Sequence, residues 1–236
     1  MARPSQSRSR AATTSKAAPP PRAAAAKDDR RKQILQAAVK VFGEKGYHGC
    51  RISDVADEAG VAYGLVYHYY GNKDGLLASV FDVNWAFFAR AIDEIAASSQ
   101  SMRERLTQIV ELAFQAFEVA PLVVKVLVLE FGRNARLGET MEHPQVARVF
   151  KSIANIFDEG RNSGELVEGI EPNAMSILFM GSLETAFVSF VLTHSGARSK
   201  VQAAVTLEAM KRTLHALLWR GAVRPPLVGR SESGAV

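Results

Sequence analysis

Apolar residues recur at helical spacing from residue 28 onward, whereas the residues before it show no such pattern. The first repeat places Ile34, Ala38, Val41 and Phe42 on one helix face, and Gly46 is typical of the position just after a helix end. These residues predict a helix over 28–45, and two short amphipathic helices follow before residue 70. The same spacing, with Gly, Pro and Ser as breaks, predicts helices over 73–98, 102–119, 121–136, 143–163, 172–194 and 198–219.

The segment between residues 46 and 77 has the pattern of a helix-turn-helix. Ile52, Val55 and Ala56 line one face of a short helix, Gly60 allows the chain to reverse, and a second short helix follows. No segment alternates with period two for long enough to require a strand. The chain is therefore predicted to be all-α, with nine helices: a three-helix helix-turn-helix domain and then a six-helix domain.

The second short helix has an unusual outward face. If Val61, Val66 and Tyr70 point inward, the outward positions are Tyr63, Gly64, Tyr67 and His68. Three of these residues are aromatic, and the glycine has no side chain. Solvated helix faces are usually rich in Lys and Glu, whereas hydroxyl and imidazole groups can bond to phosphates and base edges. This face favours DNA binding, and the alternative is packing of the aromatics against the first helix.

Positive charge is concentrated at the N-terminus. Residues 1–33 hold nine Lys or Arg and two Asp, a net +7, which leaves −2 for the rest of a chain whose total is +5. Residues 1–27 contain no acid and no Leu, Ile, Val or Phe, so we expect a disordered basic tail that adds nonspecific attraction to phosphates. An organelle transit peptide is disfavoured because the segment lacks an amphipathic face. A flexible tail is also expected over 222–236.

Residues 46–77 closely resemble the DNA-binding domain of the TetR/AcrR family of regulators. The matching motifs are Gly46-Tyr47, Asp54-Val55-Ala56, Ala59-Gly60-Val61, Gly64, Tyr67-His68-Tyr69-Tyr70, Lys73 and Leu76-Leu77. The resemblance implies that Tyr67 and Lys73 hold phosphates and that the 63–68 face enters the major groove. It also sets the expected domains, at 28–75 for DNA binding and 76–221 for ligand binding and dimerisation.

Two N-capping hydroxyls of the family pattern are missing, because Cys50 and Ala62 stand where Thr and Ser are common. We expect Arg51 and Ser53 to act instead at the second helix, and nothing replaces the hydroxyl at position 62. The candidate DNA-binding residues are Arg51, Ser53, Ala62, Tyr63, Gly64, Tyr67, His68 and Lys73.

The larger domain is rich in large apolar rings, which predicts a cavity for a small lipophilic effector between its helices. The candidate ligand-binding residues are Trp85, Phe88, Phe114, Phe117, Phe150, Phe157 and Phe187. This half is similar, more weakly, to TetR-type regulators of fatty-acid degradation that respond to acyl-CoA, through Glu159-Gly160, Gly164 and Glu171-Pro172. The resemblance implies acyl-CoA as the effector.

The last two predicted helices have the length and apolarity to pair with a second copy in a homodimer. Ser182, Ala186 and Ser189 recur at helical spacing and would allow close approach. A dimer places two recognition helices about one DNA turn apart, as a palindromic operator requires. The apolar stretch 174–192 also raises the question of a membrane span, but Glu184 and the charged neighbouring helices favour a core or interface helix.

Other classes of function find less support. The chain has no G-x-S-x-G, P-loop or dinucleotide motif, so we expect no enzyme activity and no cofactor. The five His show no ligand spacing, which predicts no metal site, and the single Cys50 fits a cytoplasmic protein. A helical adaptor that binds protein rather than DNA is the remaining rival, and the Tyr67, His68 and Lys73 group argues against it.

Overall fold

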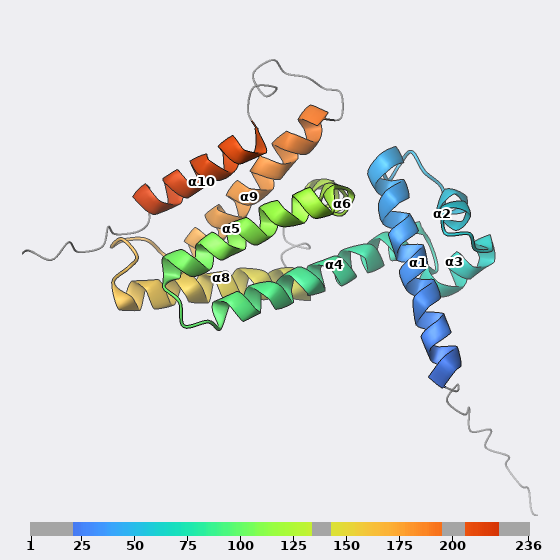
Figure 1. Cartoon of the computed structure of the whole chain (residues 1–236), viewed down its shortest axis with the longest axis horizontal. Helices are drawn as coiled ribbons and strands as arrows, with labels where there is room; N and C mark the ends of the chain where they lie inside the picture. Colours follow the sequence, from blue (N-terminus) through green and yellow to red (C-terminus); the bar gives the residue numbers. More distant parts are fainter. Residues whose placement is uncertain (1–20, 134–142, 195–205, 222–236) are drawn as a thin grey trace, which may run out of the picture.

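The computed structural model describes residues 21–133, 143–194 and 206–221. Within these ranges it has nine α-helices, which confirms the all-α prediction (Figure 1). They are α1 (Pro21–Lys45), α2 (Ile52–Glu58), α3 (Tyr63–Tyr70), α4 (Lys73–Ala96), α5 (Met102–Val119), α6 (Pro121–Arg133), α8 (Pro144–Ser163), α9 (Pro172–His194) and α10 (Leu207–Gly221).

The first three helices form a small domain at one end of the molecule (Figure 1). Its core is the apolar face predicted for the first helix, since Ile34, Ala38, Val41 and Phe42 are all buried. Val55 of α2 and Val66 of α3 are completely buried against them. Gly46 has a φ of 73° and ends α1 as expected, because glycine adopts this left-handed conformation without strain.

Two helices connect the small domain to the larger one. The first turns of α4 supply Leu76 and Val80 to the small core, so this core extends past the boundary predicted at residue 75. Helix α6 reaches back to pack on α1, where Leu122 lies against Gly43 and Val126 enters the same core. The two domains are therefore joined by a continuous helix and by a side-chain contact.

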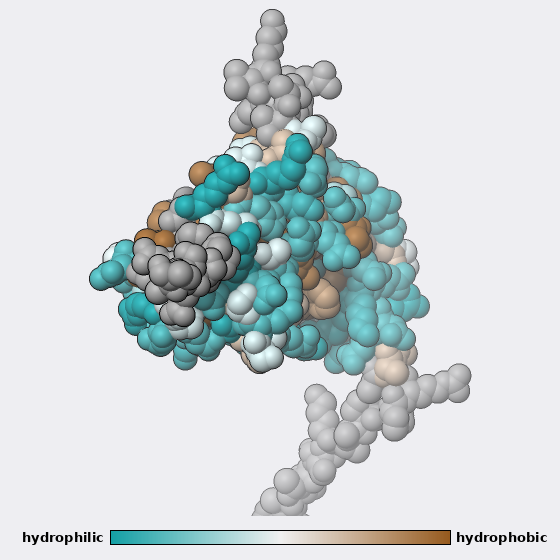
Figure 2. Space-filling model, turned by 60° about the vertical axis from the view of Figure 1, so that its left-hand side comes forward, coloured by the Kyte–Doolittle hydropathy of each residue, from teal (hydrophilic) through white to brown (hydrophobic). Residues whose placement is uncertain are grey.

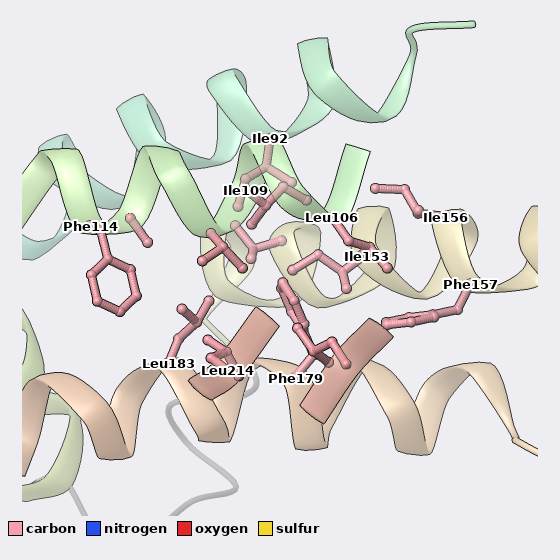
Figure 3. Packing of buried hydrophobic residues seen from close by; sticks show 14 of the residues in the cluster. Ile92, Leu106, Ile109, Phe114, Ile153, Ile156, Phe157, Phe179, Leu183 and Leu214 are labelled. Carbon is pink, nitrogen blue, oxygen red and sulfur yellow. The ribbon is translucent and has the colours of Figure 1, made fainter. Parts of the chain in front are cut away.

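The larger domain packs α4, α5, α8, α9 and α10 around one apolar core (Figure 3). Ile92 of α4, Leu106 of α5 and Ile153 of α8 are completely buried, and Phe179 of α9 faces them. Arg105 of α5 is also buried, and its guanidinium donates to the Ala96 carbonyl at 3.0 Å and to Glu159 at 2.5 Å. This arginine ties the end of α4 to α8, because a buried charge needs such partners.

Helices α5 and α8 approach each other closely at Gly160. A Cβ built on this glycine would lie 2.1 Å from the sulfur of Met102, a distance that real contacts do not show. The glycine that formed part of the acyl-CoA-type motif in the sequence therefore has a packing role.

We expect Gly160→Val to destabilise the fold by about 1–3 kcal/mol, because the added methyl groups must displace Met102 in a close-packed core. Urea-induced unfolding of the purified protein measures this loss. The double variant Gly160→Val, Met102→Ala should recover part of the stability, since the shorter side chain makes room. An unchanged unfolding midpoint for Gly160→Val would show that the two helices can separate without cost.

Several helix ends differ from the predicted ones. Helix α1 begins at Pro21 rather than at residue 28, so the prediction of disorder is wrong for residues 21–27. Proline suits a first helical position, and the four alanines that follow have the highest helix propensity. Helix α10 begins at Leu207, where Thr206 accepts a bond from the Ala209 amide. The predicted tail segments 1–20 and 222–236 lie outside the described residues.

Helix α4 and the Pro172–Leu192 part of α9 are long and apolar enough to cross a membrane, judged by length and composition alone. In the structure α4 contributes side chains to the cores of both domains, and α9 buries Phe179, Leu183 and Phe187 against its neighbours in the larger domain. Figure 2 presents a mainly hydrophilic surface at this end of the molecule, with hydrophobic residues in separate places. The packing supports the predicted core or interface role for α9.

Candidate nucleic-acid interface

The turn between α2 and α3 sets the position of the exposed helix. Gly60 has a φ of 60° in this turn, and the amide of Val61 donates to the Ala56 carbonyl at 3.0 Å. The side-chain amide of Gln33 on α1 donates to the Ala59 carbonyl at 2.7 Å. The turn is thus bonded to the long first helix, which holds α3 at a fixed orientation.

Helix α3 presents the outward face that the sequence predicted. Val66 and Tyr70 are buried, whereas Ala62, Tyr63, Gly64, Tyr67 and His68 are exposed. Tyr63 is 51% exposed and Tyr67 is 40% exposed, and their ring centroids are 4.8 Å apart. A hydrogen bond to Tyr67 raises the pKa of the Tyr63 hydroxyl. The alternative of packing against α1 does not apply to these two rings.

Gly64 leaves a gap in this face. A Cβ at this position would have no atom within 4 Å, so packing inside the protein does not require a glycine here. A glycine costs about 1 kcal/mol of helix stability relative to alanine. The absence of a side chain instead leaves the surface of α3 open beside Tyr63 and Tyr67 in the first turn of the helix.

The starts of α2 and α3 lack the two capping hydroxyls of the family pattern. Helix α3 begins after Ala62, which makes no side-chain capping bond, as expected. Arg51 is the N-cap residue of α2 but its side chain makes no capping bond, so the expected roles of Arg51 and Ser53 as caps are not supported. Instead the carboxylate of Asp54 accepts the Arg51 amide at 2.6 Å. A hydrogen bond from Lys45 and that backbone bond lower the pKa of Asp54.

Lys73 is only partly available to a ligand. Its ammonium donates to the Cys50 carbonyl at 2.5 Å and lies 4.4 Å from the centre of the Tyr47 ring. The Tyr47 hydroxyl in turn bonds to Asp74 beside Lys73. Lys73 therefore fixes the start of α4 against the loop before α2, and part of its donor capacity is already used.

Two further lysines of the small domain are paired with acids. Lys40 lies 2.7 Å from Glu58, and Lys45 lies 2.7 Å from Asp54. These pairs link α1 to α2 across the surface. Residues 34–75 hold four Lys or Arg and five Asp or Glu, so the helix-turn-helix alone has little attraction for phosphates.

The seven candidate ligand-binding rings belong to the core of the larger domain. Trp85, Phe114, Phe157 and Phe187 are buried, and Phe88, Phe117 and Phe150 pack against them. The structure brings them together in separate groups. Phe187 of α9 stacks on Phe117 at 5.5 Å and meets Phe114 at 5.1 Å, Trp85 meets Phe88 at 5.8 Å, and Phe157 meets Phe179 rather than another candidate ring.

Sequence reasoning missed three features of this region. It did not find the Asp54 cap, although the Asp at the third helical position is a usual capping-box signal. It left Phe179 out of the candidate ring group, and it did not find the α6 contact with α1. Among the described residues, no group of three or more His, Cys, Asp or Glu is arranged to hold a metal ion.

Residues 34–80 match the family model described as "Bacterial regulatory proteins, tetR family". The fatty acid metabolism regulator protein of Bacillus subtilis (strain 168) is 28% identical over 165 residues, which cover 68% of this chain and 82% of the relative. The HTH-type transcriptional regulator BetI of Burkholderia thailandensis is 31% identical over 131 residues, 53% of this chain and 66% of the relative.

Solved structures of similar architecture include two fatty-acid regulators. The fatty acid degradation regulator FadR from Bacillus halodurans has a TM-score of 0.68 at 25% identity, covering 80% of this chain and 98% of that one. FadR from Bacillus subtilis in complex with stearoyl-CoA has a TM-score of 0.68 at 24% identity, covering 79% and 96%. These relatives are regulators and not enzymes, in agreement with the expectation from the sequence. With its helix-turn-helix and its nine described helices, the chain has the DNA-binding segment and the overall fold of the TetR family of bacterial transcriptional regulators.

Proposed function

We propose that this protein is a ligand-responsive repressor that binds a palindromic operator as a homodimer and is released by a small lipophilic effector. The observation that carries the proposal is the exposed face of α3, where Tyr63, Gly64, Tyr67 and His68 stand together and no helix of the described ranges covers them. In a bacterial cell such a protein would act in the cytoplasm, where the DNA is.

The α3 face suits the major groove, which is wide enough to admit a helix. The hydroxyls of Tyr63 and Tyr67 and the imidazole of His68 are donors and acceptors for base edges and phosphates. Ala62 adds only a methyl group and Gly64 no side chain at the start of the helix, so its backbone can approach the DNA. Arg51 and Ser53 at the start of α2, and the remaining donor capacity of Lys73, would contact the flanking phosphates.

A homodimer is supported by the second apolar face of α9. One face of this helix is buried in the core, yet Ile177, Leu178 and Leu192 are exposed, and Leu178 is 67% exposed. Leu217 on α10 is exposed to 68%. A helix that is apolar all round is normally buried on all sides. The small residues expected at the interface are a poorer fit, because Ser182, Ala186 and Ser189 are partly buried and the most exposed apolar residues lie on other positions.

An acyl-CoA effector is supported by the likeness to the two FadR structures, one of which contains stearoyl-CoA. A regulator from Saccharomonospora viridis of the same architecture contains choline, at 18% identity and a TM-score of 0.68. We favour the acyl-CoA because the rings between α5 and α9, Phe114, Phe117 and Phe187, are apolar and would contact an alkyl chain. Choline would need a cage of rings around a cation.

Tyr67→Ala tests the DNA-binding function. We expect it to weaken operator binding about 5- to 150-fold, the loss expected when one well-placed contact of about 1–3 kcal/mol is removed. Tyr67 is exposed, so the variant should keep its helicity and its oligomeric state. Fluorescence anisotropy with a duplex that wild-type protein retains from genomic fragments measures the affinity.

A matched control is Thr107→Ala on α5, which removes a half-buried hydroxyl that donates to the Arg103 carbonyl in the larger domain. It should bind DNA like wild type. If Tyr67→Ala also binds like wild type, α3 does not contact DNA through this face. If wild-type protein retains no duplex at all, the adaptor alternative becomes the better account.

A further inference from the structure

The N-terminal part of α1 is longer than the small domain needs. Among the side chains of α1 that the structure describes, the first buried one is Ile34, and every residue from 25 to 33 is exposed. At 1.5 Å per residue, the segment of the helix from Pro21 to Gln33 is about 20 Å long. Figure 1 shows α1 running past α3 and projecting from the small domain. A solvated helical extension of this length calls for a role outside the core.

This extension carries four cations in its described side chains, at Lys27, Arg30, Arg31 and Lys32, against two acids at Asp28 and Asp29. The rest of the helix-turn-helix domain, residues 34–75, has four Lys or Arg. Three of its four cations already have partners, since Lys40 pairs with Glu58, Lys45 with Asp54, and Lys73 with the Cys50 carbonyl. Most of the described positive charge that is exposed near α3 therefore lies on α1.

Two contacts fix the extension against α3. The Tyr70 hydroxyl of α3 donates to the Arg31 carbonyl at 3.0 Å, and Gln33 donates to the carbonyl of Ala59 in the turn. The ammonium of Lys27 lies 5.9 Å from the centre of the Tyr69 ring, and the guanidinium of Arg31 lies 6.0 Å from it. Cations within about 6 Å of a ring face are attracted to it. The position of these charges relative to α3 is thus set by the fold.

The same ring connects the cations to the exposed face of α3. The centroids of Tyr69 and His68 are 5.5 Å apart, and His68 belongs to the outward face. Lys27 and Arg31 lie four residues apart and therefore point to the same side of α1. The surface made of Lys27, Arg31, Tyr69 and His68 is continuous, and it passes from a basic helix to an aromatic, uncharged one.

We propose that Lys27 and Arg31 form a second DNA-binding surface, which holds backbone phosphates next to the half-site that α3 reads. The proposal rests on the proposed function, because it takes α3 as the reading helix. It separates two tasks in one domain: the uncharged α3 face discriminates between bases, and the α1 extension supplies affinity that depends on salt but not on sequence.

The test uses the full-length double variant Lys27→Gln, Arg31→Gln, because glutamine keeps a high helix propensity without the charge. Its matched control is Arg90→Gln, Lys151→Gln, which removes two exposed charges from α4 and α8 of the larger domain. Affinity is measured from 50 to 200 mM salt on two duplexes of equal length, one retained from genomic fragments by wild-type protein and one of random sequence.

We expect Lys27→Gln, Arg31→Gln to bind both duplexes roughly tenfold more weakly at 0.1 M salt, and to lower the salt slope by about two for each bound protomer. The ratio of the affinities for the two duplexes should stay unchanged. The control variant should bind both duplexes with the affinity and the salt slope of wild-type protein. Hydroxyl-radical footprinting should lose protection of the backbone beside the half-site while protection within it remains.

A salt slope equal to that of the control variant would overturn the proposal. The proposal would also be overturned if Lys27→Gln, Arg31→Gln bound DNA like wild type but no longer bound vesicles containing phosphatidylglycerol. That result would assign the surface to anionic lipid. Failure of the proposed function has a different signature, because wild-type protein would then bind both duplexes equally and Tyr67→Ala would have no effect. The salt slope on the random duplex still tests the α1 surface in that case.

Discussion

Gly64→Leu is expected to reduce operator affinity roughly 30- to 150-fold, equal to about 2–3 kcal/mol, while the protein stays folded. The position has no neighbour within 4 Å of a Cβ, so a leucine meets no obstacle inside the free protein. In the complex the same side chain would project from α3 beside the Tyr63 and Tyr67 pair and hold α3 away from the base edges. Anisotropy titration gives the affinity, and thermal unfolding gives the stability.

The graded control is Gly64→Ala. It should stabilise the free protein by up to about 1 kcal/mol, because alanine is the better helix former. Its operator affinity should fall by less than that of Gly64→Leu, since one methyl group occupies little of the gap. Wild-type affinity in the leucine variant would mean that the backbone of α3 does not approach DNA at this residue.

Titration of the operator complex with a long-chain acyl-CoA is expected to lower operator affinity roughly 5- to 150-fold, which corresponds to a coupling free energy of about 1–3 kcal/mol. A ligand shifts the equilibrium only if it binds the two domain arrangements unequally. Two routes lead from the core to α3: the continuous helix α4, and the α6 contact in which Leu122 lies against Gly43 of α1. Calorimetry and anisotropy, with and without the effector, give both affinities.

Leu122→Ala separates binding from coupling. It removes the side chain that touches Gly43, and it should reduce the effect of the ligand on DNA affinity while the ligand still binds. Free CoA, free fatty acid and choline serve as comparison ligands. If only another apolar compound released the protein from its operator, the repressor function would stand and that compound would replace acyl-CoA as the effector. Tight acyl-CoA binding with unchanged operator affinity would remove the induction mechanism.

The local parts of the DNA-binding region could be predicted from the sequence because their signals are local. The buried and exposed sides of α3 follow from helical spacing, and the positive φ of Gly46 and Gly60 follows from the turns they occupy. The lost cap at Ala62 was also visible, because capping depends on one side chain.

The remaining features depend on contacts between distant segments. The start of α1 was missed because an alanine run forms a helix without an apolar face. The partial engagement of Lys73 depends on the loop at Cys50, and the packing of Leu122 on Gly43 joins residues far apart in sequence. Which aromatic rings of the larger domain contact each other could not be predicted for the same reason. Helical spacing shows which residues share a face of a helix, but not which neighbouring helix covers that face.

The most direct test of the central claim is guanine methylation interference on the duplex that full-length wild-type protein selects from genomic fragments. We expect two clusters of interfering major-groove positions, related by a dyad and about one helical turn apart, and their loss in Gly64→Leu. Selection of a duplex on which methylation of guanine N7 in the major groove does not interfere with binding, or no selection at all, would contradict the reading of DNA by α3.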